Sequence, residues 1–154
     1  MGASVAANAI GPVIRGRRGL FGYTVGILVL ETTIPRLPGA IGNASTFPFP
    51  VLQRVVPGAS GEATVRALGR CKRGTPEFAA ATAPWLQAAR DIVAEGAKAV
   101  TTSCGFTAVF QRELTEAVDA PVFASSLLLA PLIQRMLKPD RVVGAIVADS
   151  RSMS

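Results

Sequence analysis

The sequence predicts an α/β protein with an open parallel sheet and flanking helices, in a flavodoxin-like arrangement. Short apolar segments over residues 99–103, 121–124 and 141–148 alternate with segments whose apolar residues recur at helical spacing. Strands that alternate with helices form parallel sheets, because right-handed crossovers bring each strand beside an earlier one. At 154 residues and 49% hydrophobic content, the chain is long enough to bury one core.

Residues 24–30 are predicted to form the first strand, and residues 1–22 to be an extension that precedes the fold. Val25 to Leu30 is apolar without alternation, which is typical of a strand buried on both faces. Glu31 to Gly61 carries five prolines and four glycines and is interpreted as a long loop. It leaves the carboxyl end of a strand, so we expect a functional loop, with a floppy insertion as the alternative.

Residues 77–98 are predicted to form the longest helix. Thr75 is a suitable N-cap before Pro76, and Gly96 is a suitable stop. Pro84 is expected to kink or divide this helix, because it lies beyond the first turn. The remaining predicted elements are a strand over 99–103, a helix over 107–118, a strand over 121–124, a helix over 127–137 and a strand over 141–148.

Charge and composition disfavour several classes of function. The net charge is +6, but seven basic residues lie in two acid-free stretches, residues 1–20 and 66–73. Without aromatic residues between the charges, these stretches predict a solvated tail and loop rather than a nucleic-acid site. No apolar run approaches the roughly 18 residues of a membrane span, and the N-terminus lacks the charge order of a signal peptide. We expect a cytoplasmic protein without nucleic-acid or membrane partners.

Cys104 is predicted to be the catalytic residue. It stands in Thr101-Thr102-Ser103-Cys104-Gly105-Phe106, where an apolar strand passes into a helix. A thiol at a helix N-terminus lies beside free N–H groups and the positive end of the helix dipole, which favour the thiolate. Cys71 lies in a basic stretch and is interpreted as an exposed loop thiol. Because the chain has no histidine and only two cysteines, we expect no metal site.

Polar residues follow three of the predicted strands, at residues 31–33, 103–105 and 125–126. The carboxyl ends of parallel strands meet at one edge of a sheet, so these residues are expected to converge on a pocket. Hydroxyl and free N–H groups in such a pocket suit an anionic ligand such as a carboxylate. For Ser125 and Ser126, capping of a helix is the alternative interpretation.

The sequence resembles a known family in three segments: residues 27–32, residues 36–43 with Thr46 and Phe47, and residues 101–106. The family that these segments resemble is that of the aspartate/glutamate racemases, within the wider Asp/Glu/hydantoin racemase superfamily. The resemblance, which runs from about residue 26 to 149, implies a cofactor-independent isomerase with two similar α/β domains facing each other across a cleft. In such a racemase, one thiolate removes the α-proton of an amino acid and a second thiol protonates the opposite face.

The resemblance also implies roles for individual residues. Cys104 would be the acid–base cysteine of the N-terminal half, and the N–H groups of Gly105 and Phe106 would hold the carboxylate of a small amino-acid substrate. The residues expected to line the cleft are Thr32, Asn43, Thr46 and Ser126. Residues 23–154 would then form the N-terminal racemase-type domain, and the missing second domain makes the chain look truncated.

Two alternatives to a racemase follow from the single strand-end cysteine and the short length. One is a one-cysteine enzyme similar to arylmalonate decarboxylases or maleate isomerases, in which a lone thiol protonates a carbanion or adds to a double bond. The other is a non-catalytic half-protein that binds a carboxylate or forms a homo-oligomer through exposed apolar surface. A flavodoxin-like nucleotide binder is disfavoured, because no glycine-rich phosphate motif follows any strand.

Overall fold

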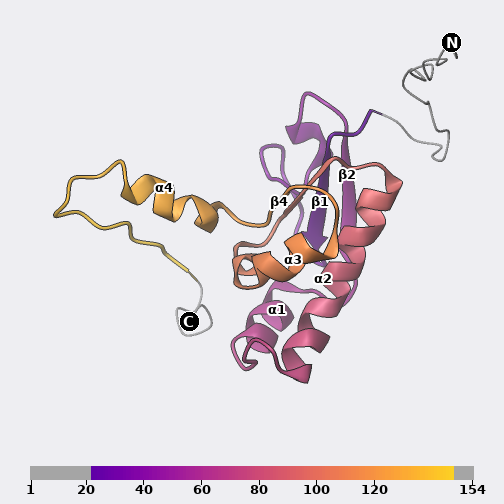
Figure 1. Cartoon of the computed structure of the whole chain (residues 1–154). Coiled ribbons are helices and arrows are strands. Elements are labelled where there is room, and N and C mark those ends of the chain that lie inside the picture. The colour runs from indigo at the N-terminus through magenta and orange to yellow at the C-terminus, as the bar shows by residue number, and fades with distance from the viewer. Residues whose placement is uncertain (1–21, 148–154) are drawn as a thin grey trace, which may run out of the picture.

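Four parallel strands form the sheet, in the order β2-β1-β3-β4 (Figure 1). The computed structural model describes residues 22–147, so nearly all of the predicted extension over 1–22 lies outside the described residues. The strands are β1 (Val25–Leu30), β2 (Val51–Val56), β3 (Ala99–Thr102) and β4 (Val122–Phe123). The predicted α/β class, with a parallel sheet and flanking helices, is therefore confirmed.

α-Helices lie between β2 and β3 and between β3 and β4, and one more follows β4. The α-helices are α1 (Gly61–Leu68), α2 (Pro76–Glu95), α3 (Gln111–Ala117) and α4 (Ala130–Gln134). Short 3₁₀ helices are η1 (Ala44–Thr46), η2 (Gly105–Phe110) and η3 (Ser126–Leu129). The long helix α2 contacts three of the strands and also α1 and α3, so it joins the sheet to the other helices (Figure 1). No helix among the described residues combines the length and the apolar character that a membrane crossing requires.

The start and end of α2 agree with the start and stop signals predicted from the sequence. The Thr75 hydroxyl accepts a hydrogen bond from the Phe78 N–H at 3.3 Å, and Gly96 ends the helix with a positive φ of 130°. The expected division at Pro84 is wrong, because α2 continues through it as one helix. Trp85 and Ile92 are buried after Pro84 as Phe78 is before it, so core packing compensates for the lost hydrogen bond.

The core lies between α2 and the sheet. Leu28 of β1 is fully buried there, and the rings of Trp85 and Phe110 pack with their centroids 6.0 Å apart. Gly26 allows the end of α2 to approach β1, because a Cβ atom there would lie 2.8 Å from the Cβ of Ala97. This packing fixes the amino end of β1 against the end of α2.

The predicted long loop over 31–61 is wrong in its second half. Residues 51–56 form β2, which pairs with β1 in register from Val25 opposite Val51 to Leu30 opposite Val56. Pro50 and Pro57 flank this edge strand instead of interrupting it, so neither removes a hydrogen bond from the ladder. Ser60 then caps α1, so Arg66 lies in a helix and not in the predicted basic loop.

The predicted strand over 141–148 is also wrong. Residues 141–147 form no strand and pair with no strand of the described chain, and residue 148 lies outside it. Both α4 and this segment extend away from the sheet (Figure 1). An apolar run predicts a strand only where a sheet edge lies within reach, and here Val142 and Ile146 are exposed. The expected homo-oligomer stays a prediction.

Candidate active site

Cys104 lies just beyond the carboxyl end of β3, as the sequence predicts. The strand order places β3 on one side of β1 and β2 on the other, so the connections leaving β1 and β3 diverge at this point. Open α/β sheets bind ligands in the crevice at such a switch point, outside the carboxyl ends of the strands. Cys104 therefore occupies the position at which this fold class places its chemistry.

Hydrogen bonds from Ser103 hold this turn against the end of β1. The Ser103 N–H donates to the Leu28 carbonyl at 2.9 Å, and the Ser103 hydroxyl accepts from the Leu30 N–H at 3.0 Å. The side chain thus extends the β1–β3 pairing beyond the last ladder residue. The backbone that carries Cys104 is fixed relative to two strands.

Two buried threonines fix the backbone of Cys104 itself. The Cys104 N–H donates to the Thr102 hydroxyl at 3.1 Å, and the Thr107 hydroxyl donates to the Cys104 carbonyl at 2.5 Å. Both hydroxyl oxygens also lie within 2.9 Å of the Ala124 carbonyl, at the end of β4. No role was predicted for these threonines from the sequence, although the spacing Thr-x-Cys-x-x-Thr was an available signal.

Burial raises the pKa of the Cys104 thiol, because its side chain is shielded from water in a residue only 7% exposed. The backbone N–H groups of Phe106 and Thr107 hydrogen-bond to the sulfur and lower the pKa, but their effect is smaller. Cys104 is the N-cap residue of η2, as expected for a strand-to-helix turn. The expectation that this position favours the thiolate overall is nevertheless wrong, because burial dominates.

A cavity of about 410 Å³ lies against Cys104. Cys104 and Phe106 form one part of its wall, and α1 forms the rest through Gly61, Glu62, Val65 and Arg66. Glu62 and Arg66 form an ion pair with 2.7 Å between their charged atoms, and their side chains are 72% and 66% exposed. The cavity wall is thus almost entirely apolar; Cys104 forms part of it, and an exposed ion pair lies on the α1 residues that border it. The α1 residues of this wall were not predicted as site residues, because α1 itself was not predicted.

Three of the predicted substrate-binding residues lie in the loop after β1 and hydrogen-bond within it. The Thr32 hydroxyl accepts from the Ile34 N–H, and Asn43 caps η1 by accepting from the Ser45 N–H. The Thr46 hydroxyl accepts from the Gly39 N–H and donates to the Ala40 carbonyl. None of the three lines the cavity beside Cys104, and their role in substrate binding stays a prediction.

The other predicted residues lie close to Cys104 along the chain or across the sheet edge. Phe106 lines the cavity, whereas Gly105 is exposed, and a Cβ atom on it would lie 3.9 Å from the Ser125 hydroxyl oxygen. Ser126 is exposed, and it is the buried Ser125 that caps η3 by accepting from the Leu127 N–H at 3.2 Å. Their binding roles also stay predictions.

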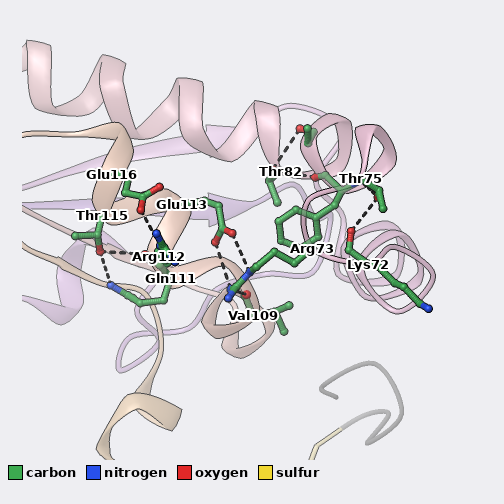
Figure 2. Close-up of polar contacts among 12 residues, drawn as sticks. Lys72, Arg73, Thr75, Thr82, Val109, Gln111, Arg112, Glu113, Thr115 and Glu116 are labelled. Carbon is green, nitrogen blue, oxygen red and sulfur yellow. Dashed lines mark hydrogen bonds and ion pairs between the residues drawn. The ribbon is translucent and has the colours of Figure 1, made fainter.

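The basic segment before α2 is tied to the segment that follows Cys104. Arg73 pairs with Glu113 of α3 at 2.9 Å and donates to the Val109 carbonyl at 2.6 Å (Figure 2). Cys71 in the same segment is half-buried and packs against the core, so the interpretation as an exposed thiol is wrong. A second cavity, of about 790 Å³, lies between Arg73, α2 and Glu113 but does not reach Cys104.

Within residues 22–147, no three histidine, cysteine, aspartate or glutamate side chains gather closely enough to bind a metal ion. Among the described residues, the groups that can act at this site are the thiol, the backbone N–H groups and the charged pair on α1. Such a set can exchange one proton with a small ligand and balance a charge of either sign.

The chain is similar to two proteins that share the same enzyme name. It is 28% identical over 137 residues to a dimethylsulfoniopropionate lyase of Durusdinium sp. clade D, covering 84% of this chain and 41% of that protein. It is 30% identical over 131 residues to dimethylsulfoniopropionate lyase 7 of Emiliania huxleyi, covering 84% of this chain and 36% of that protein. The chain thus spans about two fifths of the length of these relatives. No protein-family model and no solved structure matches it.

These relatives overturn the functional prediction made from the sequence. The relatives are named as lyases, and no family model supports the aspartate/glutamate racemase family, so the predictions of that family and of an amino-acid racemase are wrong. The alternatives, a maleate-isomerase-like one-cysteine enzyme and a non-catalytic half-protein, do not match a lyase either. The resemblance rested on short segments around strand ends, which proteins with different reactions can share.

Proposed function

We propose that this chain acts in the cleavage of dimethylsulfoniopropionate, or of a similar sulfonium carboxylate, with Cys104 as the base. The observation that carries the proposal is the position of Cys104, which lines an almost entirely apolar cavity bordered by the Glu62–Arg66 ion pair. We propose this substrate because both relatives are named dimethylsulfoniopropionate lyase. Because the chain spans only part of their length, the activity of the whole protein belongs to the proposal.

The proposed reaction is a β-elimination. The Cys104 thiolate takes a proton from the carbon next to the substrate carboxylate, and the electrons of that C–H bond form a carbon–carbon double bond. The carbon–sulfur bond breaks, and its electron pair leaves with sulfur as neutral dimethyl sulfide. The organic product is acrylate, and the proton carried by the Cys104 thiol returns to solvent. No oxidant, reductant or water molecule is consumed.

The environment of Cys104 suits this role. A proton on carbon next to a carboxylate is only weakly acidic, so a strong base is needed, and a thiol with a raised pKa gives a more basic thiolate. A cationic sulfonium group that enters the cavity would favour the thiolate, because an opposite charge within a few ångströms stabilises the charged form. The substrate would therefore help to ionise its own base.

The position of the site supports the finer fold assignment as part of this proposal. The order β2-β1-β3-β4 agrees with the first four strands of a flavodoxin-like sheet, in which ligands bind at the switch point between β1 and β3. Cys104 lies at that point. We also infer a reduced, cytoplasmic setting and a small carboxylate as the partner, since a thiol base must stay unoxidised to work.

The test is release of dimethyl sulfide from dimethylsulfoniopropionate, measured by gas chromatography of the headspace, with acrylate measured by proton NMR. Cys104→Ser should lower the rate by about 10²–10⁴, the usual contribution of a positioned base. Cys71→Ser is the matched control and should keep the rate, because Cys71 does not line the cavity. The proposal fails if the protein releases no dimethyl sulfide above the buffer rate, or if Cys104→Ser is as active as the unsubstituted protein.

A further inference from the structure

We propose that Glu62 and Arg66 recognise the two charged ends of a zwitterionic substrate in the cavity beside Cys104. Arg66 pairs with the carboxylate, and Glu62 pairs with the onium cation. This inference rests on the proposed function, to which it adds the residues that select the substrate class. The class is a small molecule that carries one cation and one carboxylate a few bonds apart.

The first support is the position of the two residues. Both line the cavity that Cys104 also lines, and they pair with each other at 2.7 Å across one turn of α1. The helix that carries them is fixed, because Ser60 caps it and Thr64 and Leu68 on its other side are buried. The two opposite charges are thus exposed next to one another, on residues that border a largely apolar cavity.

The second support is electrostatic. A ligand with a single charge pairs with only one member of the pair when it binds, whereas a zwitterion that inserts between them pairs with both. Glutamate and arginine at positions i and i+4 have Cβ atoms about 5–6 Å apart, a separation suited to a molecule with charges a few bonds apart. The pair is largely exposed, so it contributes little to stability and can open at little cost.

The chain contains a matched control on another helix. Arg112 and Glu116 of α3 form an ion pair of the same i, i+4 type at the same 2.7 Å, and both side chains are exposed. Neither residue lines the cavity beside Cys104. Any effect of charge removal that is specific to the cavity must therefore appear at the α1 pair and be absent at the α3 pair.

The first experiment measures the charge preference of Cys104 without any need for lyase activity. In the Cys71→Ser protein, Cys104 is modified with methanethiosulfonate reagents that carry an anionic, a cationic or a neutral group. Arg66→Gln should slow the anionic reagent relative to the neutral one by about 3–10-fold at low salt, and Glu62→Gln should slow the cationic reagent in the same way. The effect should shrink near 0.15 M salt, where the Debye length is about 8 Å. Arg112→Gln and Glu116→Gln should leave both ratios unchanged.

The second experiment measures elimination kinetics with dimethylsulfoniopropionate. Arg66→Gln and Glu62→Gln should each raise KM by about 5–20-fold while kcat changes little, since both residues bind the substrate but do not move the proton. Propionate, which has only the anionic end, should inhibit Arg66→Gln more weakly and Glu62→Gln no more weakly than the unsubstituted protein. Tetramethylammonium should show the opposite pattern.

The two experiments separate this inference from the proposed function. If elimination depends on Cys104 but the α1 variants behave like the α3 variants in both assays, the inference is overturned and the function stands. If no elimination occurs but the reagent ratios respond to Glu62 and Arg66 as described, the function is overturned and the placement of the charges stands. If the reagent ratios do not respond and no elimination occurs, both fail.

Discussion

The hydroxyl oxygens of Thr102 and Thr107 lie 2.8 Å apart and hold the backbone of Cys104 between them. Both oxygens also lie within hydrogen-bond distance of the Ala124 carbonyl, so the turn that carries the thiol is fastened to the end of β4. The thiol is therefore positioned by side chains that do not line its cavity. A base must be held within hydrogen-bond reach of the proton that it removes, which gives this network a role in catalysis as well as in stability.

Thr107→Val tests that role. Valine has nearly the same shape but no hydroxyl, so the buried Cys104 carbonyl and Thr102 hydroxyl each lose a partner. We expect the free energy of unfolding to fall by about 1–3 kcal/mol, measured by urea denaturation. We also expect kcat for elimination to fall, because the thiol is held less precisely. The pH dependence of kcat should be unchanged, because the thiol stays equally buried.

The control for this substitution is Thr115→Val on α3. The exposed Thr115 hydroxyl also donates to a backbone carbonyl, that of Gln111, at 3.0 Å. Its loss should change the free energy of unfolding by less than about 0.5 kcal/mol, because exposed groups exchange their partners for water. Equal effects of the two substitutions would show that burial of the network does not matter.

The elements that the sequence predicted correctly are those with a complete local signal. Each of these signals spans only a few consecutive residues. They are the apolar runs of β1 and β3 and the Thr75–Pro76 start of α2, and the structure contains all three elements. β2 was missed because prolines surround it, and the sequence does not show that they flank the strand. The run over 141–147 was assigned to a strand because its composition does not reveal whether a sheet edge is available.

The residues of the candidate site also differ in whether a local sequence signal predicts them. Cys104 was predicted because a cysteine at a strand-to-helix turn is a local pattern. Glu62 and Arg66 come from a helix about forty residues earlier, and only the crossover from β2 brings them to the same cavity. Burial, which raises the pKa of the thiol, also depends on this packing and has no local signal. The arrangement of the site depends on such long-range packing, which the short segments that carried the resemblance do not contain.

The raised pKa of Cys104 predicts a rate that increases with pH. The reacting form is the thiolate, so kcat/KM should rise about tenfold per pH unit while the thiol is mainly protonated. The rise should continue past the ordinary thiol pKa of about 8.5 before it levels. Measurement of dimethyl sulfide release from about pH 6 to about pH 10 covers this range. A rate already constant below about pH 8 would contradict the role of Cys104 as a buried base.

The same pKa makes folding stability depend on pH in a defined direction. The thiol ionises more easily in the unfolded chain than in the folded one, so above about pH 8.5 the unfolded state binds fewer protons. Stability from this group is fully present below that pH and falls as the pH rises toward the folded pKa. Cys104→Ala should remove this part of the decline, whereas Cys71→Ala should not. Urea denaturation of the three proteins between about pH 7 and about pH 10 measures the difference.

Val65→Phe tests whether the cavity beside Cys104 admits the substrate. Val65 lines that cavity from α1 and is half-buried, so a phenyl ring there would occupy part of the roughly 410 Å³ space. We expect elimination and the alkylation of Cys104 by iodoacetamide each to slow by at least about tenfold, because both need access to the thiol. Overpacking should cost no more than about 1–3 kcal/mol of stability, so circular dichroism should show a folded protein. Ala94→Phe, at an exposed position on α2, is the matched control and should leave both rates unchanged. If Val65→Phe folds and both rates are unaffected, the substrate reaches Cys104 from another side, and α1 does not form the wall of the active site.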